Sequence, residues 1–413
     1  MIRIEGRRRG VRFALTTGLA AVAAVLGTTG AALAGTPATV ATGTVRDAGA
    51  PGAIGDSYIV VLKADSAAAP QVTSVSQKLV KKYGGTVVAN YTATVRGFHA
   101  RMTAPQAARL AADSTVSYVE QDATVRGAGN QEGASWGLDR LDQRALPLSG
   151  TFTFGSAAGV TAYVIDSGIR ITQQDFAGRA SYGWDFVGRD SLAGDCNGHG
   201  THVAGTVGGA LYGVAKNVKL VSVRVLDCKG DGAYSSIIAG VDWVTAHAVK
   251  PAVANMSIAG PISTALNNAV TRSIASGVTY SVAAGNDGKN ACAYSPATVP
   301  NAITVGATDR TDKRAPFSNT GACVDLFAPG VQVASDSAKS DTAVEAMGGT
   351  SMSAPFVTGA AALLLGANPT WTAAQVRTAL VARATPNAVQ LPGTGSPNKL
   401  LYTGTQEIAA ARR

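Results

Sequence analysis

Apolar runs and helical segments alternate from about residue 160 to the C-terminal part of the chain. Uninterrupted apolar runs predict strands, and apolar residues at three- and four-residue spacing predict helices. The expected strands are 160–165, 218–226, 252–258, 278–283 and 302–305, and the expected helices are 201–210, 235–249, 263–276 and 354–365. Strands without polar alternation are buried on both faces. The pattern therefore predicts a doubly wound α/β domain, whose mainly parallel sheet carries helices on both faces.

A smaller unit of strands and helices precedes this domain. Its expected strands are 58–62, 86–91, 98–102 and 116–120, and its expected helices are 68–82 and 105–112. A segment of about seventy residues is long enough for an independent domain. The glycine-rich, polar segment 126–135 is the best domain boundary in the chain. We therefore expect a small α+β domain at 56–128 and the larger domain at 129–402, with a tail at 403–413.

The first 34 residues have the pattern of a secretory signal peptide. Five arginines precede an apolar run at 13–26, and Ala32-Leu-Ala34 supplies the small residues of a cleavage site. A retained membrane anchor is the alternative, but the apolar run is short for a bilayer span. Residues 35–55 are rich in Thr, Ala and Pro and are expected to form a flexible spacer. The sequence thus predicts an exported protein without a membrane anchor after signal removal.

Composition and charge narrow the function classes. The net charge is +9, of which residues 1–34 carry +4, residues 35–128 carry +3 and the rest carry +2. Because most of the excess lies in the N-terminal segments and forms no basic stripe, nucleic-acid binding is not predicted. The 48 glycines and a mean hydropathy of +0.14 indicate many tight turns around a sizeable core.

Three polar residues lie where functional residues gather in a domain built on a parallel sheet. Asp166 directly follows an expected strand, at the end where functional groups gather in such sheets. His199 lies in Asn197-Gly-His-Gly-Thr-His202, before an expected helix. Ser351 lies in Gly348-Gly-Thr-Ser-Met-Ser-Ala-Pro355, where another expected helix opens. Singly, these residues are ordinary turn, loop and cap residues. Together, in the order Asp, His, Ser, they predict a nucleophilic serine with a histidine base and an orienting carboxylate.

These strings resemble the three signatures of the subtilisin-like serine proteases. Trp136-Gly-Leu-Asp-Arg and Gly395-Ser-Pro-Asn-Lys-Leu-Leu-Tyr402 also resemble the proteinase K and aqualysin branch, and the resemblance runs from about residue 56 to 402. It implies a secreted serine endopeptidase, monomeric, that cleaves proteins or peptides through an acyl-enzyme on Ser351. It further implies that residues 56–128 are an inhibitory propeptide, which the enzyme removes by cutting itself near 127–130.

The resemblance also assigns residues around the triad. It implies that Asn286 supplies the oxyanion hole. It implies that the primary specificity pocket, which prefers hydrophobic or aromatic side chains, is lined by Ser257, Ile258, Ala259, Gly260, Ala283, Ala284 and Gly285. Beside the expected substrate, the sequence departs from the family pattern, because Ala259 and Pro261 stand where glycines are usual. Proline also lacks a backbone donor.

Metal and disulfide assignments rest on the same resemblance. It implies one structural Ca²⁺ site made by Pro300, Ala302 and Asp325 and a second made by Asp139, Asp142 and Gln143. The four cysteines of an exported chain are expected to form disulfides, and their number alone allows three pairings. The resemblance implies the pairs Cys196–Cys228 and Cys292–Cys323.

Two other functions fit parts of the sequence. A binding protein with the same fold and impaired catalysis is suggested by Ala259 and Pro261 beside the expected substrate. A zinc-dependent hydrolase is suggested by Cys196, His199, His202 and Cys228, which are ligand types at close spacing.

Overall fold

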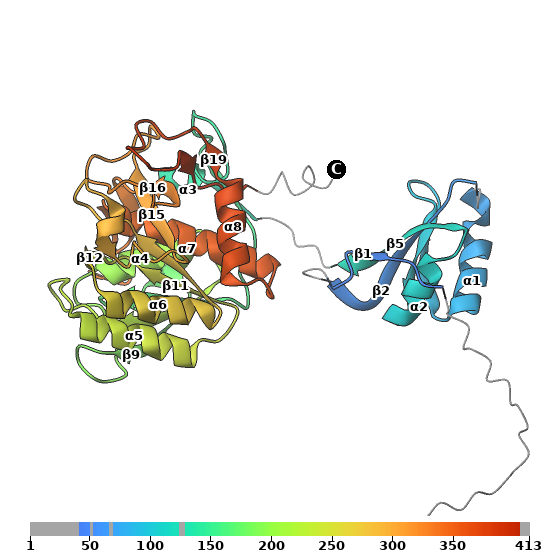
Figure 1. Cartoon of the computed structure of the whole chain (residues 1–413), viewed down its shortest axis with the longest axis horizontal. Helices are drawn as coiled ribbons and strands as arrows, with labels where there is room; N and C mark the ends of the chain where they lie inside the picture. The colour runs from blue at the N-terminus through green and yellow to red at the C-terminus, as the bar shows by residue number, and fades with distance from the viewer. Residues whose placement is uncertain (1–40, 50–52, 66–68, 124–128, 405–413) are drawn as a thin grey trace, which may run out of the picture.

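The computed structural model describes residues 41–49, 53–65, 69–123 and 129–404 (Figure 1). The expected signal peptide at 1–34 and most of the expected tail at 403–413 lie outside the described residues. The expected cleavage region at 127–130 lies partly outside them, since the description resumes at Gly129.

The N-terminal unit is a five-stranded sheet with two helices. In the sheet the strand order is β1-β5-β2-β4-β3, and β1 runs parallel to β5 while the other pairs are antiparallel. The elements are β1 (Val45–Arg46), β2 (Ala53–Leu62), η1 (Ala69–Gln71), α1 (Val72–Tyr83), β3 (Thr86–Tyr91), β4 (Gly97–Arg101), α2 (Ala104–Ala111) and β5 (Val116–Ala123). Alternate residues Tyr58, Val60 and Leu62 of β2 enter the core with side chains from both helices. The expected elements of this unit are all present.

The expected spacer at 35–55 is partly wrong. Val45 and Arg46 form β1 at the edge of the sheet, and β2 begins at Ala53. Val45 packs against the core, and the Arg46 guanidinium lies 4.0 Å from the centre of the Tyr118 ring. These contacts are with residues far along the chain, so the local composition of the segment gave no sign of them.

The larger domain is built on a nine-stranded sheet. Its strand order is β19-β20-β16-β15-β13-β11-β8-β10-β9, and every pair is parallel except β19 with β20. The strands are β8 (Thr161–Asp166), β9 (Ala180–Asp185), β10 (Lys219–Arg224), β11 (Ala252–Met256), β13 (Val278–Ala283), β15 (Ile303–Thr308), β16 (Leu326–Pro329), β19 (Thr385–Pro386) and β20 (Lys399–Leu400). All five strands expected in this domain are present in the sheet.

Helices cover both faces of this sheet (Figure 1). They are α3 (Trp136–Asp139), α4 (His199–Gly208), α5 (Tyr234–His247), α6 (Thr264–Ala275), α7 (Thr350–Ala367) and α8 (Ala373–Arg383), with short 3₁₀ turns η2 (Gln174–Phe176) and η3 (Ala291–Ala293). Ala162 and Val164 of β8 pack in the core beneath α4 and α7. Tyr163 and Ile165, which alternate with them, pack in the core beneath α5 and α6. The strand is therefore buried on both sides, as its unbroken apolar pattern predicts.

Three small antiparallel pairs complete the domain. They are β6 (Gly129–Glu132) with β7 (Thr151–Phe154), β12 (Gly260–Pro261) with β14 (Tyr294–Ser295), and β17 (Val333–Asp336) with β18 (Val344–Met347). The expected strand at 252–258 ends at Met256. Residues 257–259 therefore run free of any sheet between β11 and β12.

Helix α7 is the central helix of the domain. Among the described residues it is the one helix long and apolar enough to cross a membrane, but 78% of it is buried inside the protein. It packs against α4 and the strands β11, β13 and β15. Its apolar character is thus explained by its place in the core.

Candidate active site

Asp166 and His199 are hydrogen-bonded to each other. Asp166 ends β8 and is fully buried. Its Oδ1 accepts from His199 Nδ1 (2.7 Å) and from the Ser167 N–H (2.7 Å). Because Nδ1 donates to the carboxylate, the free lone pair of the neutral ring lies on Nε2. Nε2 of His199 is therefore available to accept a proton from a neighbouring group.

The pKa of His199 is raised above its ordinary value. Burial opposes protonation of the ring, but the charge of Asp166 and its hydrogen bond outweigh burial, and Asp195 adds to their effect. The imidazolium form is thus stabilised by its neighbours. A histidine that must accept a proton during a reaction needs such support.

Two glycines bring the first turn of α4 against β8. Gly198 precedes the helix with φ of +105°, a conformation that favours glycine. A side chain on Gly200 would overlap the Gly168 carbonyl oxygen. The glycines on both sides of His199 are therefore needed for the ring to reach Asp166.

Asp195 fastens the same turn and was missed by the sequence analysis. Its carboxylate accepts from the Ser167 hydroxyl (3.0 Å), the Gly198 N–H (2.8 Å), and the Thr201 N–H (2.9 Å) and hydroxyl (2.6 Å). It links the segment after β8 to the start of α4. The sequence feature that could have identified Asp195 is its position in the glycine-rich loop, just before Cys196.

Ser351 lies in the first turn of α7, which contains a proline four residues later. Pro355 has no N–H, so the Ser351 carbonyl lacks its usual helical donor. The Ser257 hydroxyl donates to that carbonyl instead (2.6 Å), and Asn255 Nδ2 donates to Ser257 Oγ (2.9 Å). The end of β11 thereby holds the start of α7 in place.

His199 and Ser351 line one cleft of about 590 Å³. The Ser351 hydroxyl donates to the Ser257 carbonyl (3.2 Å). Rotation about the Cα–Cβ bond of the serine would turn its hydroxyl away from this carbonyl. Leu226, Lys229 and Asp231, which the sequence analysis did not assign, line the cleft as well.

Asn286 lies on the same cleft with its amide oriented by Thr350. Its Oδ1 accepts from the Thr350 N–H (2.8 Å) and hydroxyl (2.9 Å). The residue is exposed, and its Nδ2 is the end of the amide left to donate into the cleft. The orienting role of Thr350 was not predicted from the sequence.

The residues expected to line the specificity pocket lie on two facing segments. One runs from Ser257 through Ile258 and Ala259, which lie between β11 and β12, to Gly260, the first residue of β12. The other is Ala283–Gly285, at the end of β13, and is buried. Ser257, Ile258, Ala259 and Ala283 line the cleft together with Ser351.

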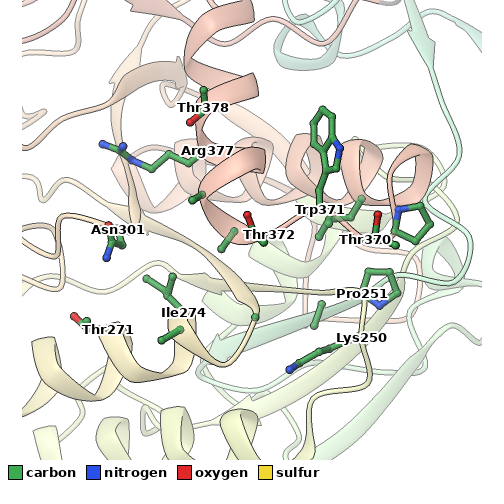
Figure 2. Close-up of a pocket in the computed structure, with 17 residues that line it drawn as sticks. Lys250, Pro251, Thr271, Ile274, Asn301, Thr370, Trp371, Thr372, Arg377 and Thr378 are labelled. Carbon is green, nitrogen blue, oxygen red and sulfur yellow. The ribbon is translucent and has the colours of Figure 1, made fainter. Parts of the chain in front are cut away.

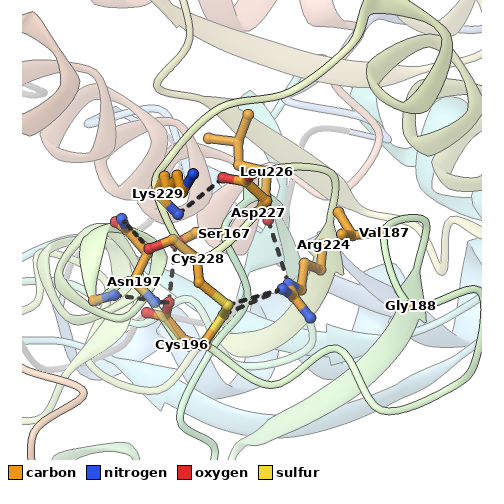
Figure 3. The surroundings of a disulfide bond; sticks show 12 residues. Ser167, Val187, Gly188, Cys196, Asn197, Arg224, Leu226, Asp227, Cys228 and Lys229 are labelled. Atoms are coloured by element: carbon orange, nitrogen blue, oxygen red, sulfur yellow. Dashed lines mark hydrogen bonds between the residues drawn. A yellow bond between two sulfur atoms is a disulfide. The ribbon is translucent and has the colours of Figure 1, made fainter.

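The four cysteines form two disulfides with the pairing that the family resemblance implied. Cys196 bonds to Cys228 and Cys292 bonds to Cys323. The first joins the segment before α4 to the segment after β10, and Asn197 Nδ2 donates to the Cys228 carbonyl (3.2 Å) (Figure 3). This disulfide therefore restrains the chain segment that leads into His199.

The residues that suggested a zinc-dependent hydrolase are bonded to other groups in this structure. Cys196 and Cys228 are bonded to each other. Buried His202 bonds through Nε2 to the Val333 carbonyl (2.9 Å), and burial lowers the pKa of His202 to about 4. Within the described residues, no group of three or more His, Cys, Asp or Glu side chains is arranged to hold a metal.

The carboxylate of the first expected calcium site is already paired. Asp325 Oδ2 accepts from the Thr304 N–H (2.9 Å), and Oδ1 accepts from Arg377 Nη2. Figure 2 shows Arg377 extending from α8 on the side of the pocket where Asn301 lies, between Pro300 and Ala302 in the chain. The guanidinium supplies the positive charge that a cation would supply, so this set does not fit Ca²⁺ as it stands.

The residues of the second expected calcium site include unsatisfied polar atoms. Asp139 is engaged by Ser149 and by the Gly150 N–H (2.7 Å). Asp142 Oδ1 and the Gln143 amide nitrogen are buried without a hydrogen-bond partner. Burial, together with the charge of Asp139, raises the pKa of Asp142. The uncompensated Asp142 Oδ1 is a carboxylate oxygen, the ligand type that suits Ca²⁺.

Comparison with known proteins identifies two families. Residues 157–401 match the Subtilase family of S8 peptidases, and residues 57–128 match the peptidase inhibitor I9 family. The chain is 50% identical over 372 residues to the extracellular serine proteinase of Thermus sp. (strain Rt41A), covering 86% of this chain and 91% of that protein. It is 47% identical over 367 residues to alkaline serine exoprotease A of Vibrio alginolyticus, covering 86% and 68%.

A solved structure supports the same assignment. The crystal structure of a cold-adapted subtilisin-like serine proteinase shares 50% identity with this chain and aligns with a TM-score of 0.65, covering 67% of this chain and all of that one. At such identity the alternative of a mere binding protein is set aside. The chain belongs to the subtilase family and is a serine endopeptidase of the subtilisin-like type, preceded by an inhibitory I9 propeptide domain.

Proposed function

We propose that the protein is exported, cuts itself free of residues 56–128 near 127–130, and hydrolyses extracellular proteins as a monomer. The signal-like N-terminus and the names of the relatives support export. The observation that carries the catalytic assignment is the 2.7 Å Asp166–His199 hydrogen bond on the cleft that also holds Ser351.

The proposed reaction begins at Ser351 Oγ. The hydroxyl turns from the Ser257 carbonyl toward His199, whose Nε2 takes its proton as Oγ attacks the peptide carbonyl. Asp166 holds the ring and stabilises the imidazolium. His199 then gives the proton to the leaving amine, and water releases the acyl group from Ser351 by the reverse sequence of proton transfers.

The proposed oxyanion hole combines a side chain with a helix terminus. Asn286 Nδ2 is free to donate because Thr350 holds the oxygen end of its amide. The Ser351 N–H lies in the first turn of α7, where N–H groups have no intrahelical acceptor. Both donors face a charge that develops only when the substrate carbonyl becomes tetrahedral.

Substitution Asn286→Ala is expected to lower kcat by about 10²–10³-fold, the range measured for a single oxyanion donor in a related subtilase. KM should change little, because the donor acts on the transition state. Steady-state kinetics on a peptide substrate measures both constants. A kcat within threefold of wild type would contradict the assignment of Asn286 to the oxyanion hole.

We further propose that Ca²⁺ binds at Asp139, Asp142 and Gln143. The two carboxylates would supply negative charge, and the Gln143 amide can turn to present its oxygen. The unpartnered Asp142 Oδ1 is the observation that supports this assignment. At the other set, Pro300, Ala302 and Asp325, calcium would have to displace Arg377 from the carboxylate.

Removal of calcium by a chelator is expected to lower the melting temperature, because a ligand bound only to the folded state adds to stability. Asp142→Asn should abolish most of that chelator-dependent shift, whereas Asp325→Asn should leave it in place. Differential scanning calorimetry of both variants, with and without chelator, makes the comparison. An unchanged chelator effect in Asp142→Asn would contradict the assignment.

A further inference from the structure

Ala259 lines the cleft that holds Ser351, on the segment assigned to the primary specificity pocket. Ala259 is exposed in the cleft, at a position where the family pattern has glycine. A Cβ atom built on Gly285, in the facing segment, would lie 3.5 Å from Ala259 Cβ. Adding one Cα–Cβ bond of about 1.5 Å places the Gly285 backbone within about 5 Å of that methyl.

This separation leaves no room for a substrate group between the two walls. Non-bonded carbon atoms pack at about 3.5–4 Å, so an atom inserted between two walls needs about 7 Å between them. Ala259 and Ala283 line the cleft, whereas buried Gly285 does not, as expected if the pocket is closed at this level. The space that remains lies beside Ser257, Ile258 and Ala283, next to Ser351.

The Gly285 wall is anchored and cannot move back easily. Buried Asn319 donates from Nδ2 to the Ala284 carbonyl (2.9 Å), and its own N–H donates to the Gly285 carbonyl (3.0 Å). The Gly285 N–H donates to the Thr350 hydroxyl (3.1 Å). Retreat of this wall would break all three hydrogen bonds.

The Ala259 wall is anchored on both sides as well. Ser257 is tied to the Ser351 carbonyl, and Gly260 pairs with Ser295 across β12 and β14. The carbonyl of Pro261 accepts from the Tyr234 hydroxyl (2.5 Å). The slot between residues 259 and 285 is therefore a fixed feature of the free enzyme.

We propose that Ala259 is a specificity-determining residue that makes the primary pocket shallow. The enzyme then cleaves after small side chains such as alanine or serine in preference to aromatic ones. This proposal rests on the proposed function of Ser351 and on the assignment of the two walls to the primary pocket. It replaces the broader hydrophobic or aromatic preference that the family resemblance implies.

The test uses the mature enzyme and two peptides that differ only in alanine or phenylalanine before the scissile bond. Wild type is expected to show a kcat/KM at least about tenfold higher for the alanine peptide. Ala259→Gly should shift the ratio of the two kcat/KM values toward phenylalanine by about tenfold or more, a range typical of single pocket contacts. Ala259→Val should shift it the other way. Ala158→Gly, a matched change at an exposed alanine, should not shift it.

Two results would overturn the proposal. One is a wild-type enzyme that cleaves after phenylalanine as well as after alanine. The other is an Ala259→Gly enzyme whose ratio stays within twofold of wild type. Titration of Ser351 with a fluorophosphonate in every sample separates these outcomes from failure of the proposed function. An enzyme that takes up no label would overturn both proposals at once.

Discussion

Ser351→Ala is expected to abolish peptide hydrolysis and to leave the precursor uncut. Loss of the corresponding serine in a related subtilase lowers kcat by about 10⁶-fold. The same nucleophile is proposed to release residues 56–128, so the variant should accumulate at the mass of the signal-processed precursor. Intact-mass analysis of the secreted protein, with a peptide assay, measures both effects.

Ser353→Ala is the matched control for that variant. Ser353 lies in the same turn of α7, and its buried hydroxyl donates to the Ala328 carbonyl (3.1 Å). Its loss should cost about 1 kcal/mol of stability and leave processing intact. If the Ser351→Ala precursor matured at the wild-type rate in a host without other proteases, self-processing by Ser351 would be wrong.

Asp166→Asn is expected to lower kcat by about 10⁴-fold, the magnitude known for the equivalent change in another serine protease. The amide keeps the shape of the side chain but removes the charge that stabilises the His199 imidazolium. It also no longer favours the ring tautomer with the proton on Nδ1. Kinetics of the processed variant, supplied with its propeptide removed by an added protease, would give kcat directly.

The same substitution should move the acid side of the pH–rate profile. Asp166 raises the pKa of His199, and activity requires His199 to be neutral. Without that charge the pKa of His199 falls, so the residual activity should persist to lower pH than in wild type. Asp242→Asn, an exposed change on α5, should leave the profile where it is. An unchanged pH–rate profile in Asp166→Asn would contradict the claim that the charge of Asp166 raises the pKa of His199.

The candidate catalytic residues could be located from the sequence because their positions follow local rules. Asp166 ends an apolar strand, and Ser351 stands at the opening of an apolar helix. The parallel sheet and its flanking helices followed from periodicity, since both faces of β8 are buried. Glycine-rich motifs then marked where the chain must turn toward the cleft.

Other features depend on contacts between distant segments, which leave no local pattern in the amino-acid order. The edge strand β9 and the short strand β16 lack a distinctive pattern, and α8 was not predicted either. The Ser257 hydroxyl replaces a donor that Pro355 lacks 98 residues later in the chain. Arg377 reaches Asp325 across 52 positions, and only the fold reveals that the carboxylate is paired.

Ala259 illustrates what the sequence and the structure each contribute to the proposal about specificity. The sequence shows that alanine stands where glycine is usual, but not which way its methyl points. The structure places that methyl opposite Gly285, with both segments held by hydrogen bonds. A change of one methyl group thereby becomes a prediction about substrates.

The proposed function depends on Ser351 as the nucleophile of a working Asp–His–Ser site. Reaction of the matured wild-type protein with a fluorophosphonate, followed by peptide mapping, tests it most directly. One label per molecule is expected, on Ser351, with loss of peptide hydrolysis in proportion to labelling. A mature protein that hydrolyses peptides but carries no label at Ser351 would contradict it.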